Sequence, residues 1–385
     1  MTVAALVLAV SLCAHAQNPV PPGAHVEKVA GGFQFVEGPL WKDGVGLLFS
    51  DINGNTIYRW SADSGTKVYL TPTGNSNGLT FDRQGRLLFA QQGGRKVVRQ
   101  EFDSSWTVLA ATFRGKKLNS PNDLVVKSDG SIFFTDPPYG IQPSQQEVPF
   151  NGIYRINTAG DLQVLDSTLS RPNGIAFSPD ESKLYVNDTE VRTIYVWDVV
   201  ADSLIVNKRQ FALMKSSSGG ADGMKVDSAG NVFSAGPGGI WVFSPAGTVL
   251  DTILVPGQTT NCGWGEKDRK TLYITAGTSV YRIRTGLTSV PGTGALPEKG
   301  FWLGANYPNP FNPSTTIVYS VRVPGQATLE VFDVLGRRAA SLFDGAASPG
   351  VHSTTWDAAG FASGVYIARI SSGGLLATRK MLLAR

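Results

Sequence analysis

Hydrophobic and polar residues alternate along most of the chain in short runs, each ended by a turn rich in Asp, Gly, Asn or Pro. Alternation with a period of two is typical of half-buried β-strands. No stretch of ten residues has the period of an amphipathic helix. The pattern therefore predicts an all-β protein.

One such pattern recurs six times. Each copy has a polar first residue, an alternating strand, a turn rich in Asp, Gly and Lys, and a second β-rich run, and most continue into a third strand. The first residues are Glu37, Asn77, Asn122, Asn173, Asp222 and Asn261, at spacings of 40, 45, 51, 49 and 39. A repeat of about 45 residues made of short strands predicts a six-bladed β-propeller.

The two ends of this repeat region complement each other. The sixth copy ends near Thr285 without room for a fourth strand, while a strand-like segment near residue 25 precedes the first copy. We expect the N-terminal segment to supply the outer strand of the last blade and so to remove exposed sheet edges.

The rest of the chain has a different character. Residues 1–16 are uncharged and apolar and end in a small-x-small sequence, which predicts a signal peptide, too short for a membrane span, before a propeller over 17–285. Residues 286–300 are rich in Gly, Pro, Ser and Thr and predict a linker. Residues 301–385 have about seven alternating strands, which predicts a small C-terminal immunoglobulin-like β-sandwich.

Composition limits the chemistry. The net charge is only +4, without a basic block, so nucleic acid is not an expected partner. The chain has three His and two Cys, too few for most Ser-His-Asp, Cys-His or His/Cys zinc sites. Cys262 is interpreted as a core residue, because no His is available to activate it. An enzyme with this composition must rely on carboxylates, amides and a hard metal.

The six first residues of the repeats supply such groups. Each enters the innermost strand of its blade, so we expect two carboxylates and four amides to converge at one mouth of the central channel. Oxygen ligands of this kind suit Ca²⁺. Strand-entry turns also favour Asn and Asp, but that alternative does not explain Glu37. Asp51, Asp136 and Asp188 follow second strands at the same mouth and could support the site, contact substrate or form turns.

Several motifs resemble the senescence-marker-protein/gluconolactonase family, which is related to the paraoxonases. They are EGPLW at 37–41, SPNDLVV at 120–126, FTDPPYG at 134–140, RPNGIAFSPDESKLYVNDT at 171–189, ADGMKVDSAGN at 221–231 and TNCGWGEKDRKTLYIT at 260–275. The resemblance implies Glu37, Asn173 and Asp222 as metal ligands, with Asn122 as a ligand or a partner through water. It also implies Asp222 as the general base and Asn122 and Asp123 as substrate contacts.

We add Asn77, Asp136 and Asn261 to the expected substrate contacts, because they face the same mouth. Two departures affect substrate identity. Many family members have an acidic residue and a His where this chain has Gln91-Gln92-Gly93, and Ser120 replaces an Arg that holds the sugar in animal members.

The tail resembles the type A C-terminal sorting domain of the type IX secretion system. The matching phrases are NYPNPFNPSTTI, VFDVLGRR, SGVYIARI and KMLL. The resemblance implies export across an outer membrane, with the secretion and sorting machinery as partner, to the cell surface or the medium.

Together these features predict a secreted lactonase that depends on a divalent metal and opens sugar lactones or similar cyclic esters. The metal would polarise the carbonyl while a carboxylate assists the attack of water. Ca²⁺ is the expected metal, with Zn²⁺, Mg²⁺ and Mn²⁺ as alternatives. A second hypothesis is a non-catalytic propeller that binds a glycan or peptide around a structural calcium. A third hypothesis is a strictosidine-synthase-like enzyme.

Overall fold

The computed structural model describes residues 18–200, 204–286 and 301–384, except 305, 307, 308, 322 and 349. The predicted signal peptide, and all of the predicted linker but Gly286, lie outside these residues. The described residues form β-strands and one short 3₁₀ helix, η1 (Pro143–Gln145), and they contain no α-helix. None of their helices is long and apolar enough to cross a membrane.

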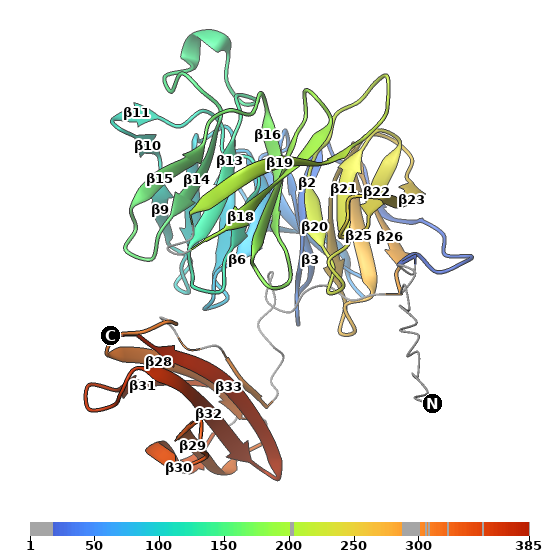
Figure 1. Ribbon diagram of the computed structural model, residues 1–385. Coiled ribbons are helices and arrows are strands. Elements are labelled where there is room, and N and C mark those ends of the chain that lie inside the picture. The colour runs from blue at the N-terminus through green and yellow to red at the C-terminus, as the bar shows by residue number, and fades with distance from the viewer. Residues whose placement is uncertain are drawn as a thin grey trace, which may run out of the picture.

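Residues 27–284 contain six four-stranded antiparallel sheets, one for each repeated segment (Figure 1). The first three sheets are β2 (Val36–Lys42), β3 (Gly46–Asp51), β4 (Thr56–Ser61) and β5 (Gly65–Leu70); β6 (Ser76–Phe81), β7 (Leu87–Gln91), β8 (Lys96–Gln100) and β9 (Trp106–Ala110); and β12 (Leu124–Val126), β13 (Ile132–Asp136), β14 (Gly152–Ile156) and β15 (Leu162–Asp166). A small hairpin, β10 (Thr112–Phe113) with β11 (Lys116–Lys117), stands between the second and third.

The other three sheets continue the series. They are β16 (Pro172–Phe177), β17 (Lys183–Asp188), β18 (Thr193–Val199) and β19 (Ile205–Leu213); β20 (Met224–Val226), β21 (Val232–Gly236), β22 (Gly239–Phe243) and β23 (Val249–Leu254); and β24 (Thr259–Gly265), β25 (Thr271–Ala276), β26 (Ser279–Arg284) and β1 (Glu27–Gly31).

The sixth sheet confirms the predicted role of the N-terminal segment. Its strand order is β24-β25-β26-β1, so the first strand of the chain is the outermost strand of the last sheet. Glu27 pairs with Arg282 across this edge, and their side chains form an ion pair at 2.9 Å. The Gly286 N–H also donates to the Pro19 carbonyl at 2.7 Å. These contacts join the two ends of the repeat region.

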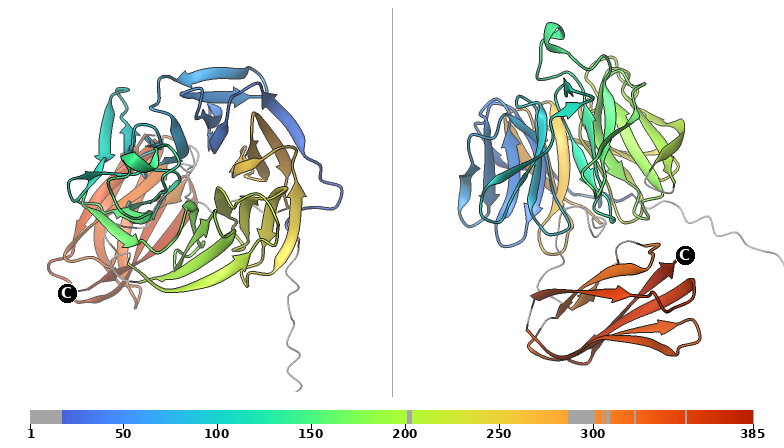
Figure 2. Two further views of the ribbon diagram at one scale, coloured as in Figure 1. Left: turned by 90° about the horizontal axis from the view of Figure 1, so that it is seen from above. Right: turned by 90° about the vertical axis from the view of Figure 1, so that its left-hand side faces the viewer.

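The innermost strands form a closed series. Each of β2, β6, β12, β16, β20 and β24 contacts the next, and β24 contacts β2. The left view of Figure 2 shows the six sheets around a common centre. Aromatic pairs fill the space between neighbouring sheets, as where Trp41 stacks on Tyr273 with ring centroids 5.5 Å apart. Alternation puts these apolar side chains between sheets.

The C-terminal region has two antiparallel sheets of its own, with seven strands in all, as expected. One contains β27 (Trp302–Leu303), β28 (Ser314–Val321) and β31 (Gly350–Asp357), and the other contains β30 (Arg338–Ala347), β29 (Gly325–Asp333), β32 (Gly364–Ser372) and β33 (Leu375–Leu383). Buried residues of both sheets, such as Ile317 and Leu329, belong to a single hydrophobic core.

Candidate metal and substrate site

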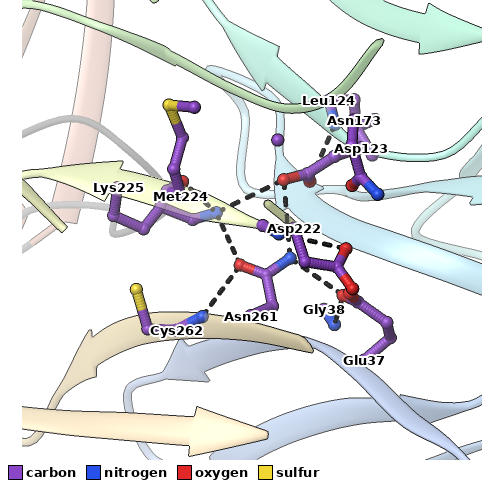
Figure 3. A network of polar contacts seen from close by, with 12 residues as sticks. Glu37, Gly38, Asp123, Leu124, Asn173, Asp222, Met224, Lys225, Asn261 and Cys262 are labelled. Atoms are coloured by element: carbon purple, nitrogen blue, oxygen red, sulfur yellow. Dashed lines mark hydrogen bonds and ion pairs between the residues drawn. The ribbon is translucent and has the colours of Figure 1, made fainter. Parts of the chain in front are cut away.

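The first residues of the six repeats lie at the starts of the innermost strands. Glu37, Asn77, Asn173 and Asn261 lie within β2, β6, β16 and β24, whereas Asn122 and Asp222 lie two residues before β12 and β20. Five of them are at most 3% exposed, and Asp222 is partly exposed. We call these six the ring residues. Figure 3 shows side chains of four of them, from different sheets, pointing toward one another.

Contacts between sheets hold the backbone of the ring residues in place. A polar side chain on the second strand of one sheet donates to the carbonyl of the ring residue on the next sheet. The donor and acceptor pairs are Ser50 with Asn77 at 2.8 Å, Thr135 with Asn173 at 2.7 Å, and Asn187 with Asp222. These side chains leave the ring residues little freedom to shift.

Three ring amides have an oxygen without a partner. The Oδ1 atoms of Asn77, Asn122 and Asn173 are buried and accept no hydrogen bond from any described residue. The Asn77 amide group donates to Gln92 Oε1 at 2.9 Å, and that of Asn173 donates to Thr189 Oγ1 at 3.2 Å. Because the NH₂ group of each of these two amides is held by a hydrogen bond, its Oδ1 atom points to the opposite side. Buried polar atoms are almost always hydrogen-bonded, so three such exceptions in one ring make it the candidate binding site.

Two ring carboxylates, Glu37 and Asp222, lie within electrostatic reach of each other. Burial, and then the neighbouring Asp123 carboxylate, raise the pKa of Glu37 above its usual range. Burial and the Glu37 carboxylate likewise raise the pKa of Asp222. A cation between them would reverse these effects. Carboxylate and amide oxygens of this kind fit a hard divalent cation.

A second network lies next to the ring (Figure 3). Asn261 Nδ2 donates to Glu37 Oε2 at 2.8 Å and approaches Asp123 Oδ2 at 3.4 Å. Its Oδ1 accepts from the Cys262 N–H at 2.9 Å and from Lys225 Nζ at 3.4 Å. Lys225 Nζ also lies 3.7 Å from Asp123 Oδ2. The Asn261 amide is thus fully engaged inside the protein.

Gly223 makes room for this arrangement. A Cβ atom at residue 223 would overlap the Asn261 side chain. Asp123 is also engaged at both oxygens, because its Oδ1 accepts from the Leu124 N–H at 2.9 Å. Asn261 and Asp123 therefore have little capacity left for the substrate contacts expected of them. The oxygens that remain open belong to Glu37, Asp222 and the three amides.

The described residues contain no group of three or more His, Cys, Asp and Glu that could hold a metal. Half of the candidate ligands are Asn, so the site depends on amide oxygens as well as carboxylates. Cys262 is fully buried, and burial raises its pKa to about 12, which suits the predicted core role.

The three carboxylates after the second strands have a different role. Both oxygens of Asp136 accept backbone N–H groups, from Asn119 at 2.8 Å and Ser120 at 2.7 Å. Asp51 accepts from Gln34, Phe35 and Gly54, and Asp188 accepts from Ser170, Arg171 and Glu190. We call Asp51, Asp136 and Asp188 the turn carboxylates. Asp136 is fully buried, so we leave it out of the substrate contacts.

The structure also explains the two departures noted in the sequence. Gln92 holds the Asn77 amide, and its carbonyl accepts from Ser120 Oγ at 3.0 Å. Ser120 Oγ in turn accepts from the Gly140 N–H at 2.8 Å. Ser120 is fully buried, so its side chain does not take over the substrate contact that the resemblance implies for an Arg at this position. The loop after β13 covers it instead.

Sequence reasoning missed Lys225 and Tyr139. Lys225 occupies the fourth position of its repeat. The other five copies have Leu, Thr, Val, Ala or Trp at that position, so Lys225 is the only charged residue there. That exception could have indicated a polar role inside the channel. Tyr139 lies in a loop outside the repeat, so no repeat position could have singled it out.

The fold and site define a β-propeller with an oxygen-rich mouth. A family model described as SMP-30/Gluconolactonase/LRE-like region matches residues 35–278. The chain belongs to this family. A second model, the secretion system C-terminal sorting domain, matches residues 305–384.

Individual relatives agree with this assignment. A gluconolactonase of Zymomonas mobilis is 36% identical over 289 residues, which cover 68% of this chain and 81% of the relative. Pentonolactonase XacC of Haloferax volcanii is 29% identical, with 62% of this chain and 80% of the relative covered. The solved gluconolactonase XC5397 of Xanthomonas campestris matches with a TM-score of 0.64 and 34% identity, covering 69% of this chain and 91% of that chain.

Proposed function

We propose that this protein is an exported lactonase that hydrolyses sugar lactones or similar cyclic esters with the help of one divalent cation, Ca²⁺ being the expected one. In this proposal the six sheets are the six blades of the propeller, and the two C-terminal sheets form the β-sandwich. The observation that carries the proposal is the set of open oxygens at the mouth, in a chain whose relatives are named as gluconolactonase and pentonolactonase.

Four residues would hold the cation: Glu37, Asn122, Asn173 and Asp222. They combine two carboxylates with two amide oxygens that have no partner in the protein. When bound, a divalent cation supplies the Lewis acidity that polarises the lactone carbonyl. Asn77 presents its open Oδ1 at the same mouth and accepts a hydrogen bond from the substrate or from a bound water.

Asp222 takes up the proton of the attacking water. It is the only partly exposed residue of the ring, and its Oδ1 accepts the Gly223 N–H at 3.1 Å. A bound cation lowers the pKa of a carboxylate ligand, so Asp222 acts as the base through the oxygen that the cation does not engage. Lys225 and Asn261 hold Asp123 and Glu37 in position beside it.

Turnover of a lactone panel by protein that is first freed of metal and then reconstituted tests this proposal. We expect no activity with chelator and activity restored by Ca²⁺ or another divalent cation. Cation binding without turnover of any lactone would favour the non-catalytic binding propeller. Absence of both would contradict the metal site itself.

The proposal of export is supported by the tail, which matches the sorting-domain model, and by the predicted signal peptide at residues 1–16. We expect the full-length protein to reach the cell surface or the medium of a bacterium with a type IX system. A chain ended after residue 300 should remain in the periplasm. Equal secretion of both chains would contradict the sorting role.

A further inference from the structure

The loop that joins β13 to β14 is fixed over the same mouth. It begins next to Asp136, whose strand pairs with the segment of Asn122: the Asn122 N–H donates to the Thr135 carbonyl at 2.9 Å. Near its start, the Gly140 N–H donates to Ser120 Oγ at 2.8 Å, and near its end, Asn119 Nδ2 donates to the Phe150 carbonyl at 2.8 Å. A Cβ atom on residue 140 would lie 2.9 Å from the Gln92 carbonyl oxygen, so glycine permits this close approach.

The loop places Tyr139 beside two ring residues. The Tyr139 hydroxyl lies next to the side chains of Thr189 and Asn173 and within the electrostatic reach of Asp222. Its oxygen is buried and makes no hydrogen bond of normal geometry with any described residue. A phenol is neutral at physiological pH, so the hydroxyl has a proton to donate.

The neighbouring groups are already engaged with one another. Thr189 Oγ1 donates to the Ala221 carbonyl at 2.7 Å and accepts from Asn173 Nδ2 at 3.2 Å. Arg171 lies over the Tyr139 ring, 5.8 Å from its centroid, and pairs with Glu190 at 3.4 Å. These contacts hold the ring in place without satisfying its hydroxyl. A buried O–H left unpaired costs free energy, which a ligand can recover.

We propose that the Tyr139 hydroxyl donates a hydrogen bond to a hydroxyl oxygen of the substrate and thereby selects hydroxylated lactones over plain aliphatic ones. This inference rests on the proposed function, because the substrate must sit over Asn173 and Asp222 for Tyr139 to reach it. A site built to bond a substrate hydroxyl discriminates strongly against an analogue that lacks one.

The test compares Tyr139→Phe with Tyr154→Phe on two substrates. Tyr154 also has a buried hydroxyl without a hydrogen bond, but it lies in a hydrophobic core, stacked on Phe134. On D-glucono-1,5-lactone we expect kcat/KM of Tyr139→Phe to fall about 10-fold, mainly through KM, and Tyr154→Phe to match wild type. On δ-valerolactone, which has no hydroxyl, both variants should match wild type, and Kd for Ca²⁺ should be unchanged.

An equal loss on both lactones, or no loss on the sugar lactone, would overturn the inference. If wild-type protein hydrolyses no lactone, the proposed function fails by itself, and calorimetric binding of D-gluconate then decides the role of Tyr139. Weaker gluconate binding by Tyr139→Phe than by Tyr154→Phe would support the contact. Equal binding by the two variants, or none by wild type, would overturn it.

Discussion

Two sets of polar side chains lie at the same end of the six sheets and differ in what their oxygens do. Each turn carboxylate is buried and accepts hydrogen bonds from two or three backbone N–H groups. Five of the six ring residues are as buried, yet three of the ring's amide oxygens accept no hydrogen bond from any described residue. Since both sets have similar residue types and similar strand-end positions, residue type alone does not distinguish a site from a turn. The difference lies in unsatisfied hydrogen-bonding capacity.

Among the substitutions that test this difference, the largest expected effect comes from a ring residue and is a loss of turnover. Asp222→Asn removes the proposed base and one carboxylate charge from the cation site, so we expect kcat on glucono-1,5-lactone to fall about 10²- to 10⁴-fold. Steady-state kinetics with saturating Ca²⁺ measures it. Asp188→Asn, at a turn carboxylate, is the matched control and should keep most of the activity. An active Asp222→Asn protein with bound metal would exclude the base assignment.

Glu37→Gln should act mainly on cation affinity. The substitution keeps the shape of the side chain but removes one of the two carboxylate charges of the ring, so Kd for Ca²⁺ should rise about 10- to 100-fold. Isothermal titration calorimetry measures the change. Glu27→Gln, which removes an exposed carboxylate paired with Arg282 at the outer sheet edge, should leave Kd unaltered. Equal affinities for all three proteins would remove Glu37 from the ligand set.

Affinity for the cation should also depend on pH. Burial raises the pKa values of Glu37 and Asp222, as do neighbouring carboxylates, Asp123 for Glu37 and Glu37 for Asp222, so these groups hold protons at pH values where ordinary carboxylates do not. The cation binds the deprotonated forms, and affinity is therefore lost as pH falls. We expect Kd for Ca²⁺ to weaken about 10- to 100-fold from about pH 7.5 to about pH 5.5. A constant Kd over this range would argue against carboxylate ligands with raised pKa values.

The smallest effect on the site is expected from the turn carboxylates. Asp136→Asn loses one of two buried backbone hydrogen bonds and should lower the free energy of unfolding by about 1–3 kcal/mol. Urea denaturation of the chelated protein measures this loss. The folded fraction should bind Ca²⁺ as wild type does. A loss of cation affinity without a loss of stability would place Asp136 in the site after all.

Much of this architecture is encoded locally, and for that reason the sequence predicts it. Alternating strands and turns repeat within each segment, so the six sheets and the strand-entry positions of Glu37, Asn173 and Asp222 follow from the pattern. The pairing of β1 with β26 was predictable because the last repeat lacked a fourth strand while the N-terminal segment had a strand without a partner.

The partners of individual oxygens were not predictable in this way. Asp136 and Asn261 were expected to face substrate, but backbone N–H groups and Lys225 occupy their oxygens. These partners depend on how turns and neighbouring sheets meet in space, which no local pattern records. Tyr139 was missed for the same reason, since its place over Asn173 depends on the Ser120 contact that holds Gly140.

The central claim is that the open oxygens of the ring bind one divalent cation. A crystal structure of the protein soaked with Mn²⁺, with anomalous diffraction to locate the metal, tests it most directly. The account predicts one anomalous peak at the mouth, about 2.0–2.6 Å from oxygens of Glu37, Asn122, Asn173 and Asp222. A peak at the turn carboxylates instead, or none at the ring, would contradict it.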